Sequence, residues 1–356
     1  MPNFILFFKI TNNSLHKFVE RQNNFDFLRL LFSSLVIFSH SFPLTGEKEL
    51  LLRITNDQID LGSLSVNVFF IMSGYLIFNS LKYSKTVNNY IWKRCLRLFP
   101  GLLVMLLISL IITAVVHNGN NIFLQKDFYS YLPNNLFLYT NQYYIAGVFE
   151  NNIFPKAING SLWTLSYEFT MYLLILLFFP IRNNKKVTLI ILFLCWIIFC
   201  LIGNVRPNFF KNIFLIINLD SARFYRLAAF FIAGSILCFF DLKKINNNLT
   251  KIGITFILIT SIYFNNYNII SNILLPILVI TIGLSFSKTL SFLPNKIGDI
   301  SYGVYIYGFI VQQTLMNYFN FNPYELAFTS FVITYILSYF SWNYIEKKTL
   351  VYKNLI

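Results

Sequence analysis

An arginine and a histidine on one apolar segment are the residues of this chain best suited to chemistry. Arg29 and His40 lie in residues 25–42, FDFLRLLFSSLVIFSHSF, which is predicted to be a helix. They are eleven positions apart, so at about 100° a residue both side chains share one helix face, about 16 Å apart along the axis. A guanidinium can hold a phosphate or polarise a carbonyl, and a neutral imidazole can take a proton from a hydroxyl group.

His40 is the one histidine of three that falls inside a predicted membrane span. An ionisable group inside a membrane is costly and is therefore a functional candidate. A lone histidine is more often hydrogen-bonded between helices, but Arg29 on the same face favours catalysis. Glu168, in GSLWTLSYEFTMYLL, lies about 10 Å below the outer end of its helix. Its carboxylate could orient or charge the imidazole or hold an acceptor; the alternative is a structural acid paired with a Lys or Tyr.

A basic cluster precedes the third apolar segment, in WKRCLRLFP. Arg94 and Arg97 are three residues apart, so we expect them to face the same way at the inner surface, beside Lys93. Paired guanidinium groups suit phosphate oxygens, which makes these three residues candidates for binding a phosphate-bearing ligand. The alternative is simple anchoring at the cytoplasmic surface. Asp26 is three residues before Arg29 and could form an ion pair with it.

Other polar and aromatic side chains interrupt the apolar segments and are weaker candidates for substrate binding. They could line a polar cavity, or they could simply bond across helices. In the helix that contains Asn67, the small residues Ser73 and Gly74 could allow close helix approach. These candidates are Asn67, Trp163, Tyr167, Tyr302, Tyr305, Gln312 and Gln313.

The composition predicts an all-α integral membrane protein. Of the 356 residues 56% are hydrophobic and 12% are charged, and a soluble domain could not bury that much apolar surface. We predict one domain, 1–356, with about ten transmembrane helices; residues 205–224 are ambiguous between an interfacial piece, a re-entrant piece and a further span. The predicted helices are 26–44, 64–82, 98–116, 161–181, 187–204, 225–240, 252–267, 269–287, 300–319 and 326–345.

The net charge of +14 is explained mainly by topology. Most of the 28 Lys and Arg residues fall in segments that lie inside if the N-terminus is cytoplasmic, as the positive-inside rule requires. Both tails, 1–25 and 346–356, are then cytoplasmic, and the long loop 117–160 is extracytoplasmic. The tyrosines of that loop could stack on sugars or form an interfacial aromatic belt. Nucleic-acid binding is not expected, and the four cysteines have no metal-site or redox spacing, so no metal is expected.

Six short motifs follow one another along the chain. They are FDFLRLLFSSLVIFSHSF, VNVFFIMSGYLIF, WKRCLRLFPG, SLWTLSYEF, GDISYGVYIYGFIVQQ and SWNYIEKK. Each is weak alone, but six in order are specific. Together they resemble the acyltransferase-3 family of bacterial integral membrane O-acyltransferases, over nearly the whole chain.

The resemblance implies roles for particular residues. The family has an Arg or Lys, ten residues and a His in its first helix, which Arg29 and His40 match. It has an Arg-x-x-Arg pair at the inner surface, which Arg94 and Arg97 match. Members typically move an acetyl or related acyl group from cytoplasmic acyl-CoA to sugars of lipopolysaccharide, capsule or exopolysaccharide.

Further features of the family are matched in part. Its Trp…Glu helix is matched by Trp163 and Glu168. Many members have a His where this chain has Gly308, so no second histidine role is expected. Some members also carry an extracytoplasmic esterase-like domain after the membrane domain, and none is expected in this chain.

Two hypotheses follow for the function. The first is an O-acyltransferase of the bacterial cytoplasmic membrane, with acetyl-CoA or another acyl-CoA as donor, an envelope saccharide as acceptor and His40 as general base or transient acyl carrier. The second is a transporter or flippase of a lipid-linked saccharide. Inverted repeats with discontinuous helices would favour transport, and the sequence shows none.

Overall fold

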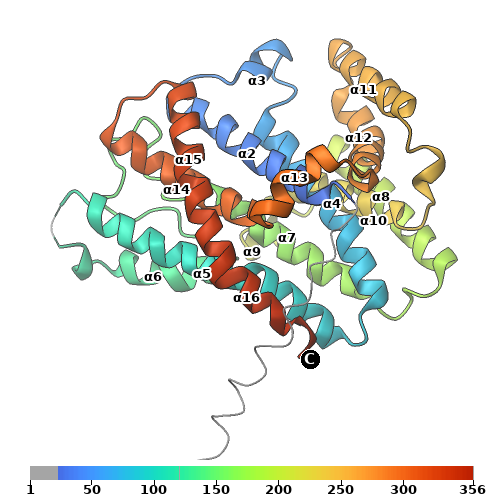
Figure 1. Cartoon of the computed structure of the whole chain (residues 1–356), viewed down its shortest axis with the longest axis horizontal. Coiled ribbons are helices and arrows are strands. Elements are labelled where there is room, and N and C mark those ends of the chain that lie inside the picture. Colours follow the sequence, from blue (N-terminus) through green and yellow to red (C-terminus); the bar gives the residue numbers. More distant parts are fainter. Residues whose placement is uncertain (1–22, 120, 356) are drawn as a thin grey trace, which may run out of the picture.

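Long apolar stretches separated by polar turns fold into helices in the computed structural model (Figure 1), which describes residues 23–119 and 121–355. No strand occurs among these residues. Most of the predicted N-terminal tail, 1–25, lies outside them. Each of the ten predicted spans has a helical counterpart: α2 (Phe25–Leu44), α4 (Leu61–Tyr83), α5 (Val87–Val116), α7 (Trp163–Leu174), α8 (Lys185–Val205), α10 (Ser221–Leu237), α11 (Asn248–Tyr263), α12 (Tyr267–Leu284), α14 (Ser301–Tyr318) and α15 (Pro323–Ser341).

Six of the described segments are long and apolar enough to cross a membrane, which supports a multi-pass membrane protein. They are α2, α4, α5, α8, α12 and the continuous segment 160–178, in which 3-10 turns η2 (Gly160–Leu162) and η3 (Ile175–Phe178) flank α7. The helices α10 and α11 have only 17 and 16 residues, and α14 and α15 are more polar. The count of ten spans and the cytoplasmic position of the termini therefore stay predictions.

The remaining elements are short connections between these helices. They are α3 (Leu50–Ile54), η1 (Ile122–Leu124), α6 (Lys126–Leu136), α9 (Lys211–Ile216), η4 (Leu242–Lys244), α13 (Lys288–Ile297), the π-helical turn η5 (Trp342–Glu346), α16 (Lys347–Thr349) and η6 (Leu350–Asn354).

The predicted start of the third span was wrong by eleven residues. The helix α5 begins at Val87 rather than at residue 98, because the Thr86 side chain accepts a hydrogen bond from the backbone N–H of Asn89 and caps it there. Lys and Arg are good helix formers, so the basic cluster at residues 93–97 is part of α5 and not the end of the preceding loop. Arg94 and Arg97 therefore lie within a helix, two to three turns from its N-terminus.

The ambiguous residues 205–224 do not form a spanning helix. Apart from the last residue of α8 and the first turn of α10, they contain only α9, whose six residues would rise about 9 Å, far less than a hydrocarbon core. Several of their large apolar side chains are exposed, including Phe210, Ile213 and Ile216. This arrangement fits the interfacial interpretation.

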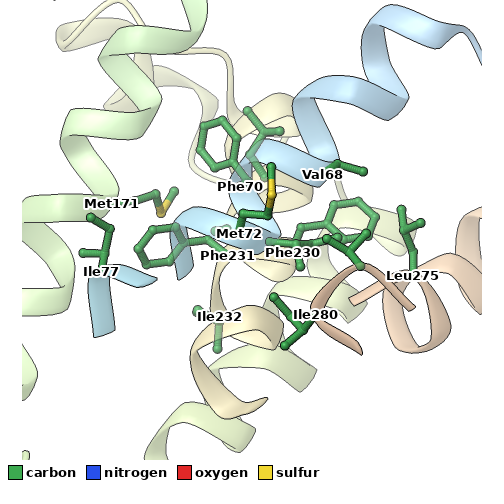
Figure 2. Packing of buried hydrophobic residues seen from close by; sticks show 14 of the residues in the cluster. Val68, Phe70, Met72, Ile77, Met171, Phe230, Phe231, Ile232, Leu275 and Ile280 are labelled. Atoms are coloured by element: carbon green, nitrogen blue, oxygen red, sulfur yellow. The ribbon is translucent and has the colours of Figure 1, made fainter. Parts of the chain in front are cut away.

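The helix α2, which carries both Arg29 and His40, lies in the middle of the bundle. It packs against α4 on one side and against α14 and α15 on the other (Figure 1). A large buried cluster fills the space between α4, α7, α10 and α12. Figure 2 shows Phe70 and Met72 of α4 beside Phe230 and Phe231 of α10. Burial of α2 on several sides makes it the scaffold of the candidate site.

Helices α4 and α10 touch through glycines, as the small residues of the second helix predicted. A Cβ atom built on Gly74 would lie 1.8 Å from the carbonyl oxygen of Phe231, and one on Gly234 would lie 2.1 Å from that of Ile71. Only glycine allows the two backbones to come this close.

Replacing Gly74 with valine is therefore expected to force α4 and α10 apart and to lower the free energy of unfolding by about 3 kcal/mol. The measurement is thermal unfolding of the detergent-solubilised protein. Gly253→Ala is the matched control, because no atom lies within 4 Å of its added Cβ, and it should leave stability unchanged or slightly raised. Equal melting temperatures for Gly74→Val and the parent would contradict this account of the crossing.

The long loop 117–160 is packed against the bundle. Its Tyr131, Phe149 and Ile158 are fully buried, in a cluster with side chains of α5 and α14. The loop is therefore a folded part of the molecule, and it contains α6.

Candidate active site

Arg29 and Arg97 meet at one end of the bundle, the end predicted to be cytoplasmic. The Oδ2 atom of Asp299 accepts hydrogen bonds from Arg97 Nη2 at 2.8 Å and from Arg29 Nη1 at 3.5 Å. The expected pair of Arg29 with Asp26 is also present, at 3.2 Å. Asp299 Oδ1 accepts from Ser301 Oγ at 2.6 Å, which fixes the carboxylate at the start of α14. Two guanidinium groups from two helices are thus held on one acid.

Arg94 points to different partners, although the three-residue spacing predicted a shared face with Arg97. Its Nη2 donates to Ser80 Oγ at 3.0 Å, and its guanidinium carbon lies 5.6 Å and 5.9 Å from the ring centroids of Tyr90 and Tyr172. Its buried Nε atom has no hydrogen-bond partner. No carboxylate forms an ion pair with Arg94 within the described part of the chain, in contrast to Arg29 and Arg97.

Lys93 extends the positive charge beside Arg94. It interacts electrostatically with Arg94, Lys85 and Lys353, which come from α5, the α4–α5 turn and the C-terminal segment. This group of four cations at one helix end can bind phosphate oxygens.

His40 lies near the other end of α2. Its ring meets the Phe309 ring edge-on, with 5.3 Å between centroids, and its Nδ1 atom is buried without a hydrogen-bond partner. Asp60, the N-cap residue of α4, acts on it electrostatically. The contact of His40 with α14 is this ring packing, and its Nδ1 takes no part in a hydrogen bond between helices.

Glu49 fixes the backbone around His40. Its Oε2 accepts from Ser39 Oγ at 2.5 Å and its Oε1 accepts from the backbone N–H of Leu61 at 2.8 Å, so it joins α2 to the start of α4. Burial raises the pKa of the Glu49 carboxyl above its ordinary value. The two helix ends that carry His40 and Asp60 are therefore held together by one buried acid.

Glu168 is a half-buried acid paired with a tyrosine, an arrangement that matches the structural alternative for this residue. It accepts hydrogen bonds from Tyr172 and, at 3.3 Å, from Ser73 Oγ. It also acts electrostatically on Tyr302 and Tyr305. The expected approach of Glu168 to His40 does not occur in the described residues, because the Tyr172 hydroxyl, one turn further along α7, holds the carboxylate instead.

Three of the weaker candidates lie on α4 and at the start of α7. Asn67 is buried, and its Oδ1 has no partner. Trp163 packs edge-on against Tyr167, and Arg223 of α10 lies 4.7 Å from the Trp163 ring centroid. The Tyr167 hydroxyl bonds the backbone of Asp220, which joins α7 to the start of α10.

Tyr302, Tyr305 and both glutamines of α14 bond to neighbouring segments of the chain. Tyr302 donates to the Leu98 carbonyl at 2.9 Å. Tyr305 donates to the Ser161 carbonyl at 3.1 Å. These contacts hold α14 to its neighbours, while the buried Gln312 Oε1 has no hydrogen-bond partner. The glutamine contacts are Gln312 Nε2 to the Ile37 carbonyl and Ser41 Oγ, at 2.8 and 2.7 Å, and Gln313 Nε2 to the Phe154 and Ala157 carbonyls, at 2.9 and 2.8 Å.

Gly308 is a packing position. A Cβ built there would lie 2.7 Å from Ile37 Cγ1, so glycine lets α14 approach α2 one turn below His40. A larger side chain at this position would need Ile37 to move.

Two cavities in the described structure lie away from these residues. An apolar one of about 430 Å³ is lined by side chains of α13 and α15 and by Ile300, and a basic one of about 250 Å³ lies at the ends of α4 and α10. Neither contains Arg29 or His40, and a passage between those two residues stays a prediction.

Three acids near the candidate site were missed by the sequence argument. Asp299 and Glu346 both act on Arg97, and Asp60 acts on His40. Asp299 and Glu346 stand in the motifs GDISYG and SWNYIEKK, at the ends of apolar stretches. The rule that singled out Glu168, a costly acid beside a membrane span, would also have found these two.

Comparison with known proteins places the chain in a family. Residues 22–343 match the family model Acyl_transf_3, an acyltransferase domain. An "O-acetyl transferase" of Shigella phage Sf6 is 29% identical over 338 residues, which are 93% of this chain and 97% of the phage protein. "Nodulation protein 10" of Rhizobium leguminosarum bv. viciae is 30% identical over 180 residues, 46% of each chain. No solved structure matches the chain.

The chain therefore belongs to the acyltransferase-3 family, and it is an acyltransferase. The resemblance found in six short motifs is confirmed. The transport hypothesis gains no support from these comparisons.

Proposed function

We propose that this protein is an O-acetyltransferase of the bacterial cytoplasmic membrane that moves an acetyl group from acetyl-CoA to a hydroxyl of an envelope saccharide. The observation that carries the proposal is the similarity to the phage O-acetyl transferase over nearly the full length of both chains. The proposed acceptor belongs to one of three classes: lipopolysaccharide, exopolysaccharide or a lipid-linked saccharide.

The basic end of α5 is the proposed entry point for the donor. Acetyl-CoA is rich in phosphate, and Arg94, which no acid neutralises among the described residues, lies beside Lys93 and two further lysines. The unpartnered Nε of Arg94 is a donor that a phosphate oxygen would satisfy. Arg29 and Arg97 are held by Asp299, so we assign them to the wall of the donor site, with Arg94 as the primary phosphate ligand.

His40 is the proposed general base. Its imidazole takes the proton of the acceptor hydroxyl as that oxygen attacks the thioester carbonyl carbon. The C–S bond then breaks, and the coenzyme A thiolate leaves with the proton that the imidazolium gives up. In a two-step version the imidazole itself carries the acetyl group between donor and acceptor. Asp60 is the charge placed to stabilise the imidazolium that forms on proton transfer.

Analysis of the envelope glycan from a deletion strain tests this function. Mass spectrometry should show a glycan that is still exported but has lost its acetyl groups, and NMR should then give the position of the acetyl group in the parent. Loss of the glycan from the surface would favour transport instead. An intact, fully acetylated glycan would reject both hypotheses.

A further inference from the structure

A basic cavity opens between the ends of α4, α8 and α10, on the end of the bundle predicted to be cytoplasmic. Its volume is about 250 Å³. None of its lining residues belongs to the candidate active site. They are Lys82, Arg182, Asn183, Lys185, Cys238 and Phe239.

Arg182 is built into the cavity wall. Its guanidinium stacks 3.6 Å from the centroid of the Phe179 ring, and its Nη1 and Nη2 atoms donate to the carbonyls of Phe179 at 2.5 Å and Ser84 at 3.4 Å. Its Nε atom is buried and has no hydrogen-bond partner. These contacts fix the position of the charge but do not neutralise it.

Two lysines add to the positive charge. Lys82 Nζ lies 5.0 Å from the centroid of the Phe239 ring, and Lys185 is the first residue of α8, where the helix N-terminus itself favours an anion. Within the described residues, none of the three cations forms an ion pair with a carboxylate. The cavity therefore gathers three uncompensated charges around one opening.

The surface next to the cavity is apolar. The first turns of α8 expose Val187, Ile190, Ile191 and Leu194. A ligand that fits this combination has an anionic head and long apolar chains. Basic pockets between transmembrane helices on the cytoplasmic side are a typical site for phospholipid headgroups.

We propose that this cavity binds one anionic phospholipid, with its phosphate among Lys82, Arg182 and Lys185 and its acyl chains along α8. The partner is identified by its net negative headgroup; a zwitterionic lipid lacks the charge to match three cations. The bound lipid would hold the α7–α8 connection against the ends of α4 and α10.

Native mass spectrometry of the full-length protein in detergent tests the proposal. The probes are phosphatidylglycerol, phosphatidylcholine and inorganic phosphate. Parental protein should retain one phosphatidylglycerol in preference to phosphatidylcholine. Lys82→Gln/Lys185→Gln should weaken that retention roughly tenfold or more, because each basic residue near a membrane surface adds to anionic lipid binding. This double variant leaves the backbone hydrogen bonds of Arg182 in place, so the fold should persist, which thermal unfolding without added lipid checks.

Lys243→Gln/Lys244→Gln is the matched control, since it removes two exposed lysines at the same predicted membrane face, outside the cavity. The control should retain the lipid as the parent does. An equal loss of phosphatidylglycerol retention in both double variants would show only nonspecific attraction to surface lysines and would overturn the proposed binding site. Equal retention of phosphatidylcholine, or complete displacement by millimolar inorganic phosphate, would overturn the lipid assignment.

Discussion

His40→Ala protein is expected to insert normally and to lose at least about 10²-fold in the rate of acyl transfer. The physical reason is that no other imidazole is placed on α2, and its Nδ1 makes no hydrogen bond, so the substitution removes a proton acceptor at the cost of the ring contact with Phe309 only. The loss would be larger if the imidazole carries the acyl group. The measurement is the initial rate of label transfer from radiolabelled acetyl-CoA to glycan in membranes that contain equal amounts of protein.

His117→Gln is the control for this experiment. His117 bonds Gln125 in the outer loop, so its replacement should change the rate little. A His40→Ala protein that transfers label at the parental rate would remove His40 from the mechanism.

Asp299→Asn is expected to lower the free energy of unfolding by about 3 kcal/mol, because it removes the charge of the carboxylate to which both Arg29 and Arg97 donate. The Asp299 carboxylate receives Arg97 at 2.8 Å and Arg29 at 3.5 Å, and its side chain is only 16% exposed. Removing its charge leaves two partly buried guanidinium groups facing each other without that anion. Denaturant or thermal unfolding of the solubilised protein would measure the loss.

Asp57→Asn provides a matched comparison. Asp57 pairs with Lys48 at 2.5 Å, but both side chains are more than half exposed, so the change should cost less than about 1 kcal/mol. Asn also tolerates the left-handed backbone found at this position, φ 62°. Similar losses for Asp57→Asn and Asp299→Asn would contradict the central role given to Asp299.

Much of the fold could be predicted because apolar length is a direct signal of membrane helices. All ten predicted segments are helical, and the Gly74 crossing follows from a run of small residues. The start of α5 was not predictable from hydropathy, because the charged residues Lys93 and Arg94 have the low hydropathy of a loop. The helix begins earlier, where the Thr86 side chain caps it.

Within the candidate site, only contacts between residues of the same helix could be predicted from the sequence. Arg29 and Asp26 are three residues apart, so their ion pair follows from helix geometry. The Arg97–Asp299 pair joins residues 202 positions apart and depends on how α5 and α14 pack. The divergence of Arg94 from Arg97 likewise depends on which neighbours each long side chain reaches, and helix phase alone does not determine that.

The most direct test of the account is transfer across a membrane. Sealed inside-out vesicles would receive radiolabelled acetyl-CoA on the cytoplasmic face, and labelled glycan would be measured in the lumen. Parental protein should label the lumenal glycan and release free coenzyme A outside, whereas His40→Ala should do neither above background. Lumenal label at equal rates in both samples, or none with the parental protein, would contradict acyl transfer through His40.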